Sequence, residues 1–242
     1  MTVVQQKPKI EVCFSPLQFH LFDSKDSIVV VVDILRATTV ITTMFHNGVH
    51  KVIPVQTIEN ALEYKKKGYL VVAERDGEKL EFADFGNSPY YFTSDIVKGK
   101  ELVYSTTNGT NAITMGKNSK QVIIGSFMNL TRVSEYLKTK TANVLILCAG
   151  WKDRFNLEDT LFAGALSEKL INSGLFITKC DSANASMDLW NIAKNDLTNY
   201  KEKIAHRHRL KKLGLDDVID YCFTIDSTEV LPYFDKGTLK ML

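Results

Sequence analysis

The chain has 242 residues, a length that fits one large α/β domain or two small ones. Its 30 basic and 28 acidic residues leave a net charge of +2, so neither nucleic acid nor a membrane surface is indicated as a partner. The apolar share of 45% is ordinary for a globular protein, and no apolar run approaches the length that spans a bilayer.

The N-terminus and the cysteines indicate the cellular compartment. Residues 1–9 read as a loose end without the apolar core of a signal peptide. The cysteines lie far apart, show no metal-ligand spacing and are expected as reduced thiols: Cys13, Cys148, Cys180 and Cys222. We therefore expect a cytoplasmic protein.

Apolar strands and helical segments alternate along the first 150 residues. Strands are predicted at 10–14, 28–34, 51–55, 69–73, 101–104, 121–124 and 144–147. Helices are predicted after the second of these strands up to Asn47-Gly48, at 57–68, from Ser88-Pro89, and at 111–117 and 130–138. This alternation predicts a layered α/β/α fold with a largely parallel, or mixed, sheet.

The chain after residue 156 reads as mainly helical. An apolar face is predicted for the segment around Leu161 to Leu170, and one or two further helices for 184–213. The basic stretch 201–212 reads as a solvated helix face, and 221–225 as a last strand. We expect one compact unit over residues 1–242; a division into two lobes near 120–140 stays open.

The strand at 28–34 carries the first functional signal. Its five consecutive β-branched residues suit a strand that is buried on both faces. Asp33, Arg36, Thr38 and Thr39 follow it, before a helix whose free N–H groups favour anions. The carboxyl end of such a strand is where open α/β sheets bind ligands. The cluster indicates a metal-assisted phosphate site, and the alternative is an ordinary capped strand end.

Polar residues follow the other apolar strands as well. Glu74, Thr106, Ser126 and Cys148 each end a strand, and the ends of parallel strands share one edge of a sheet. The run Ser105-Thr-Thr-Asn-Gly-Thr110 offers many donors at a strand-to-helix junction, which is the chemistry of an oxyanion cradle. It lacks the spacing of a Walker loop, and an ordinary capped loop is the alternative.

Four carboxylates at element ends are the candidate metal ligands: Asp33, Glu74, Glu158 and Asp159. Mg²⁺ prefers oxygen ligands and needs only one or two carboxylates beside substrate oxygens. Glu158 and Asp159 have a structural alternative, because acids in a first helical turn complement the helix dipole. Arg36 and Arg75 are expected to bind phosphate or sulfonate through their forked guanidinium groups.

Two other phosphatase patterns match only in part. Cys148 and Arg154 have the C-x5-R spacing of cysteine phosphatases, but no His precedes the cysteine. Asp33 is followed by Leu35 where the aspartyl phosphatases have a second Asp. We therefore expect neither a thiol nucleophile at Cys148 nor a D-x-D mechanism.

Six segments together resemble one family: VVDILRATT (31–39), AERDG (73–77), GNSP (86–89), STTNGT (105–110), CAG (148–150) and LED (157–159). In this order they resemble the 2-phosphosulfolactate phosphatases, the ComB-like family, over most of the chain. The resemblance implies Mg²⁺-dependent hydrolysis of 2-phospho-3-sulfolactate to 3-sulfolactate and phosphate, a step toward coenzyme M. Where the family tends to read GERGG, this chain has an acid, Asp76, near the expected substrate.

The motifs and the resemblance give these expected roles. The catalytic residues are Asp33, Arg36 and Glu74, and the ligands of the Mg²⁺ cofactor are Asp33, Glu74, Glu158 and Asp159. The substrate-binding residues are Thr38, Thr39, Arg75, Asn87, Ser88, Thr106, Thr107, Asn108, Gly109, Thr110 and Gly150. The expected partner is a small phosphoester, without nucleic acid or membrane, and a homodimer stays open. The alternative is a non-catalytic module that binds a phosphorylated or sulfonated metabolite.

Overall fold

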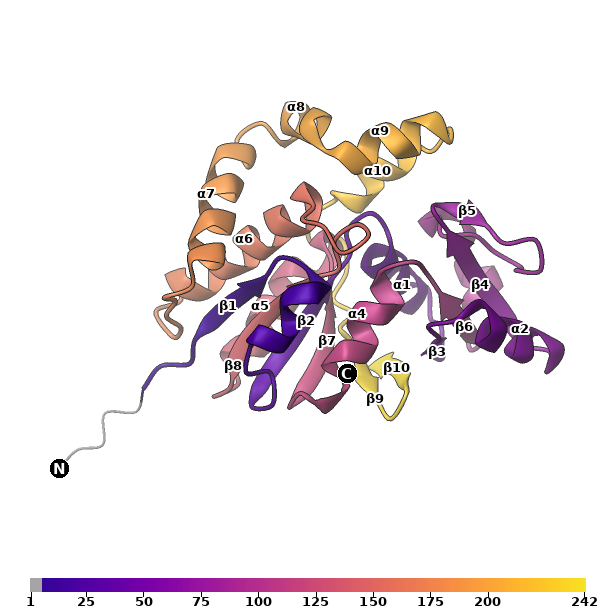
Figure 1. Ribbon diagram of the computed structural model, residues 1–242, viewed down its shortest axis with the longest axis horizontal. Coiled ribbons are helices and arrows are strands. Elements are labelled where there is room, and N and C mark those ends of the chain that lie inside the picture. Colours follow the sequence, from indigo (N-terminus) through magenta and orange to yellow (C-terminus); the bar gives the residue numbers. More distant parts are fainter. Residues whose placement is uncertain (1–5) are drawn as a thin grey trace.

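The computed structural model describes residues 6–242 as a mixed α/β protein, which confirms the predicted fold class (Figure 1). The strands are β1 (Ile10–Cys13), β2 (Ser27–Val32), β3 (Lys51–Pro54), β4 (Leu70–Arg75), β5 (Glu78–Lys79), β6 (Glu101–Ser105), β7 (Gln121–Gly125), β8 (Asn143–Cys148), β9 (Pro232–Asp235) and β10 (Thr238–Met241). The helices are α1 (Ala37–His46), α2 (Ile58–Lys66), α3 (Ser94–Val97), α4 (Gly109–Met115), α5 (Leu130–Lys138), α6 (Leu157–Asn172), α7 (Asp181–Ala193), α8 (Leu197–Tyr200), α9 (Ala205–Lys212) and α10 (Asp217–Cys222).

The ten-stranded sheet consists of two parallel groups joined by a hairpin. Its strand order is β1-β8-β2-β7-β9-β10-β3-β6-β4-β5. Strands β1, β8, β2 and β7 pair in parallel, as do β3, β6 and β4. The hairpin β9–β10 pairs antiparallel with β7 on one side and with β3 on the other. The sheet is therefore mixed, with the hairpin between the two groups (Figure 1).

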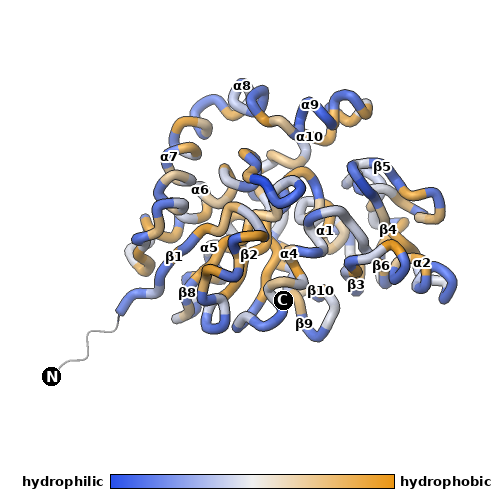
Figure 2. Tube along the Cα trace, viewed as in Figure 1, coloured by the Kyte–Doolittle hydropathy of each residue, from blue (hydrophilic) through white to orange (hydrophobic). Residues whose placement is uncertain are grey.

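Strand β2 lies inside the first group and is buried along its whole length. Val29 and Val31 pack in one hydrophobic cluster with α1 and α4. Ile28, Val30 and Val32 pack in another cluster with α5, α6 and α7. The alternation of side chains along a strand explains this division, and it gives the two helical layers around the sheet (Figures 1 and 2).

Helix α1 connects the site to both strand groups. Its residues from Ala37 to Phe45 are all buried, including four threonines. The cluster around Val40 and Met44 includes Val52 of β3 and Leu102 of β6 as well as Val31 of β2. The start of α1, directly after β2, is thus held by packing against both parallel groups.

The C-terminal half is helical as predicted, but two local predictions were wrong. Residues 221–225 do not form a strand, because Val218, Ile219 and Cys222 are buried on one face of α10. Ser88-Pro89 begins only a three-residue 3-10 turn over Pro89–Tyr91, and the Ser88 side chain caps nothing. Within residues 6–242, no helix combines the length and apolar character needed to cross a bilayer.

Candidate active site

A small cavity of about 20 Å³ lies where the carboxyl ends of β2, β4 and β6 meet the loop after β8. Its lining is strongly polar and comes from both parallel groups of strands. The lining residues are Asp33, Leu35, Arg36, Glu74, Gly77, Asn87, Thr106, Asn108, Trp151 and His206. Six of these were predicted site residues, so the polar strand ends do converge.

Asp33 is buried at the end of β2. Its Oδ1 accepts a hydrogen bond from the Ala37 N–H at 3.1 Å, at the start of α1. Burial, reinforced by the nearby Asp159 carboxylate, raises the pKa of Asp33 to about 8. A Cβ at Gly109 would lie 2.9 Å from Asp33 Oδ2 and 2.4 Å from the Ala37 Cβ. Only glycine lets α4 approach the carboxylate this closely.

Thr38 and Thr39 hold the turn that presents Asp33. The Thr38 hydroxyl donates to the Asp33 carbonyl at 3.0 Å, and the Thr39 hydroxyl donates to the Ile34 carbonyl at 2.9 Å. Both threonines are fully buried and lie outside the cavity lining. The structure thus places them behind the predicted phosphate site, where they order the backbone.

Glu74 connects two loops of the cavity wall. Its Oε2 accepts from the Gly77 N–H at 2.7 Å, and its Oε1 accepts from the Thr107 N–H at 2.8 Å. Arg36 is also buried, and its Nη2 donates to the Gly77 carbonyl at 3.4 Å. A carboxylate and a guanidinium therefore face the same cavity, each positioned by the loop after β4.

Arg75 and Asp76, next in the chain, point elsewhere. The Arg75 guanidinium donates to the Glu74 carbonyl at 2.6 Å and to the Ser105 hydroxyl at 3.0 Å, away from the cavity lining. Asp76, the departure from the family pattern, forms an ion pair of 2.8 Å with Lys152. The added acid is therefore matched by a lysine of the loop after β8.

Asp159 and Glu158 lie in the first turn of α6, buried outside the cavity lining. Asp159 Oδ1 accepts from the Ile34 N–H at 2.8 Å, and its Oδ2 accepts from the Gly150 N–H at 3.2 Å. Burial, followed by repulsion from Glu158, raises the pKa of Asp159 to about 8. Burial also raises the pKa of Glu158, to about 7, and its Oε1 has no hydrogen-bond partner. Gly150, whose N–H donates to Asp159, has a left-handed φ of 64°.

These carboxylates fit a divalent cation. Residues 6–242 contain no group of three or more His, Cys, Asp and Glu side chains that could hold a metal ion as the side chains are placed in this structure. However, Asp33, Glu158 and Asp159 are buried, and burial together with mutual repulsion disfavours their ionised forms. One oxygen of Glu158 is left without a partner. A hard cation relieves both the repulsion and the missing contact, and oxygen donors are the ligands that Mg²⁺ prefers.

Some of the remaining predicted residues line the cavity, and the others are buried outside its lining. Asn87 lines the cavity and accepts a hydrogen bond from the Tyr104 hydroxyl, whereas Ser88 is buried outside the lining. Thr106 and Asn108 line the cavity. Thr110 is fully buried, and its hydroxyl donates to the Thr106 carbonyl at 3.1 Å. Part of the threonine-rich loop thus faces the cavity and part folds back on itself.

Four lining residues were not predicted as site residues: Leu35, Gly77, Trp151 and His206. The rings of Trp151 and His206 meet edge to face with centroids 4.9 Å apart, which brings α9 over the strand ends. Burial, with a contribution from Arg209, lowers the pKa of His206 to about 3, so its imidazole is neutral near pH 7. No local pattern identifies either residue, because the contact joins segments that are far apart in the chain.

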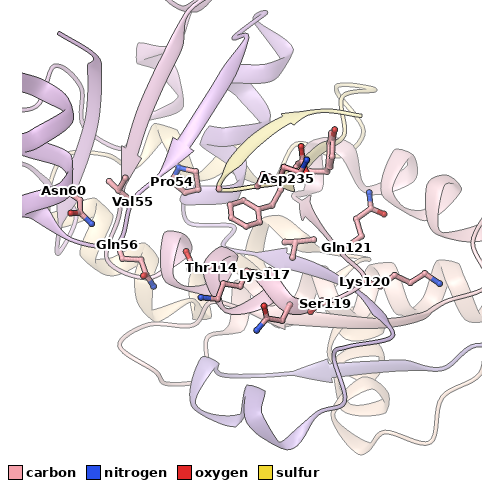
Figure 3. A pocket seen from close by; sticks show the side chains of 16 residues that line it. Pro54, Val55, Gln56, Asn60, Thr114, Lys117, Ser119, Lys120, Gln121 and Asp235 are labelled. Carbon is pink, nitrogen blue, oxygen red and sulfur yellow. The ribbon is translucent and has the colours of Figure 1, made fainter. Parts of the chain in front are cut away.

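A much larger cavity, about 760 Å³, lies elsewhere (Figure 3). It is lined by the turn of the β9–β10 hairpin and by residues around the end of α4, and it contains none of the predicted site residues. Its only carboxylate, Asp235, pairs with Lys240 at 2.8 Å. Size alone favours this cavity, but the clustered buried charges favour the smaller one as the reaction site.

Comparisons with known proteins identify the family of this chain. The model of the 2-phosphosulpholactate phosphatase family matches residues 13–237. A probable 2-phosphosulfolactate phosphatase of Thermotoga maritima is 40% identical over 86% of this chain and 89% of the relative. A protein with the same name from Caldanaerobacter subterraneus is 36% identical over 90% of this chain and 92% of the relative. Both the predicted resemblance and the prediction of an enzyme are confirmed: the chain belongs to the 2-phosphosulpholactate phosphatase family and is a phosphatase.

Proposed function

We propose that this phosphatase hydrolyses 2-phospho-3-sulfolactate to 3-sulfolactate and phosphate and that it requires Mg²⁺. The names of its relatives support the substrate, since a curated relative from Clostridium acetobutylicum, 34% identical, is also called a probable 2-phosphosulfolactate phosphatase. The reaction would belong to a pathway of the coenzyme M type, in the cytoplasm. The single observation that carries the proposal is the meeting of Asp33, Glu74 and Arg36 in one cavity.

The residues of the cavity suit a phosphate ester. Arg36 offers two N–H groups in a plane to phosphate oxygens, and the Asn87, Thr106 and Asn108 side chains add polar contacts. Asp33 and Asp159, with Glu74 and Glu158 near them, would hold the Mg²⁺. The bound cation would neutralise charge on the phosphate, which is the main demand of phosphoryl transfer. The neutral imidazole of His206 lines the same cavity and can contribute a hydrogen bond there without a charge.

Phosphate release from a panel of phosphoesters tests this proposal. The purified chain is treated with excess chelator and assayed before and after Mg²⁺ is restored. We expect 2-phospho-3-sulfolactate to be the best substrate, with turnover abolished by chelation and recovered with Mg²⁺. Full turnover in excess chelator would contradict the metal requirement. A clear preference for an ester without sulfonate would contradict the substrate.

A further inference from the structure

Arg209 of α9 is a cation without a counterion in the described structure. Its Nε is buried and has no hydrogen-bond partner. Across residues 6–242, no carboxylate lies within ion-pairing distance of its guanidinium, whereas Arg207 on the same helix pairs with Glu202 and Asp216. A half-buried guanidinium stays charged and is costly to leave unpaired.

The position of Arg209 connects it to the cavity. Its Cζ lies 3.9 Å from the centre of the Trp151 ring, so the guanidinium stacks on the indole. Trp151 lines the cavity, and so does His206, which precedes Arg209 by one helical turn. The stacking holds the half-buried guanidinium against Trp151, a residue of the cavity lining.

Two acids act on Arg209 from beyond ion-pairing distance, Glu158 and, more weakly, Asp76. Asp76 raises the pKa of Arg209 from a distance but is itself paired with Lys152. Glu158 acts in the same direction, and its Oε1 lies 3.6 Å from His206 Nδ1. Burial outweighs both and lowers the pKa of Arg209. Arg209 therefore offers one uncommitted positive charge beside a cavity that is otherwise rich in carboxylates.

We propose that Arg209, stacked on Trp151, binds a second acid group of the substrate while the phosphate occupies the Asp33 cavity. This inference rests on the proposed function. The cavity is small, about 20 Å³, so the rest of the ester must extend to the rim formed by Trp151 and His206. Both acid groups of 2-phospho-3-sulfolactate, a carboxylate and a sulfonate, are on carbons next to the one that carries the phosphate. Either one matches the fork of a guanidinium.

Four phosphate esters distinguish the contributions of the carboxylate and the sulfonate to binding. They are 2-phospho-3-sulfolactate, 2-phospholactate without the sulfonate, 2-phosphooxyethanesulfonate without the carboxylate, and ethyl phosphate with neither. For Arg209→Ala we expect kcat/KM for the full substrate, relative to ethyl phosphate, to fall about 10- to 100-fold, mainly through KM. The analogue that shows the same relative loss identifies the acid group. Arg209→Lys keeps the charge without the fork and should fall in between.

Lys212→Ala is the matched control, because Lys212 is exposed and this substitution removes a positive charge from the same helix. Its kinetics and those of the wild type should agree for all four esters, and the melting temperatures of the variants should match the wild type. An equal loss for all four esters in Arg209→Ala would overturn the inference while leaving the proposed function intact. Failure of the wild type to hydrolyse any of the esters would instead overturn the proposed function, and the inference with it.

Discussion

The surroundings shift the pKa values of different carboxylates in this protein in opposite directions. Burial and neighbouring acids raise the pKa of Asp33, whereas Asp84 has a lowered pKa. Burial acts to raise the pKa of Asp84, but hydrogen bonds from Lys65 and from the Val71 N–H outweigh it. In the candidate site, the surroundings of Asp33 disfavour its ionised form, whereas the hydrogen bonds of Asp84 favour the ionised form and so stabilise the fold.

This contrast predicts a pH-dependent stability effect for Asp84→Asn. A depressed pKa stabilises the folded protein above the unfolded value of about 3.9, and this stability is lost as the pH falls through the folded value. The variant should melt about 2–4 °C below the wild type at pH 7, which corresponds to about 1 kcal/mol. The gap should close between pH 4 and the onset of acid unfolding. Asp188→Asn, an exposed and unpaired control, should show no gap at any pH.

Substitution of Cys148 tests whether a thiol is the nucleophile. The residue is fully buried, and burial followed by repulsion from Asp159 raises the pKa of its thiol well above the usual range. A thiol that stays protonated is a poor nucleophile. Cys148→Ser should keep turnover within about tenfold of the wild type, and no phosphate should be trapped on the thiol. Complete loss of turnover in a folded Cys148→Ser enzyme would restore the cysteine mechanism.

At the scale of elements, the approach of α4 to α1 defines the site. Gly109→Ala would place a methyl group 2.4 Å from the Ala37 Cβ and 2.9 Å from Asp33 Oδ2. The elements must then move apart, at a cost of about 1–3 kcal/mol. We expect a lower melting temperature together with a loss of turnover of at least about tenfold. Unchanged turnover would mean that the spacing of α1 and α4 does not position Asp33.

The sequence predicted the elements with a strong local signal. Strands β2, β7 and β8 and helix α5 lie where their apolar runs and spacings placed them. The β9–β10 hairpin was missed because both strands are only four residues long and β9 begins with a proline. The one signal for this hairpin in the sequence was the pair Lys236-Gly237. In the structure both residues have positive φ, 45° and 86°, as a tight two-residue hairpin turn requires.

The candidate site was predictable to a similar extent. Asp33, Glu74 and Thr106 were found because each lies at the carboxyl end of an apolar strand. The same reasoning placed Thr39 and Arg75 among the substrate-binding residues, although side-chain direction in a turn has no sequence signature; both contact backbone or neighbouring side chains instead. Trp151 and His206 needed the tertiary structure, because α9 reaches the cavity from a distant part of the chain.

At the scale of the whole molecule, the hairpin β9–β10 joins two parallel groups of strands, and α1 packs against both (Figure 1). We still predict one folding unit rather than two lobes. Thermal unfolding followed by calorimetry should show a single transition, with equal calorimetric and van't Hoff enthalpies. Two resolved transitions would support a division near residues 120–140.

Magnesium should act on this same unfolding transition. A ligand that binds only the folded protein stabilises it by about 2.7 kcal/mol at a concentration of about 100 times its dissociation constant. The melting temperature should therefore rise by about 5–10 °C when Mg²⁺ is added to the chelator-treated protein. The shift should shrink strongly in Asp159→Asn. An identical shift in that variant would place the cation away from the buried carboxylates.

The central claim is that the cavity around Asp33 is the active site, and Asp33→Asn measures it most directly. The change is nearly isosteric and keeps an oxygen to accept the Ala37 N–H, so the fold should survive with a melting temperature close to that of the wild type. Turnover of 2-phospho-3-sulfolactate with Mg²⁺ should fall by a factor of at least about 1,000. Near-wild-type turnover in the folded variant would remove the end of β2 from the active site and contradict the account.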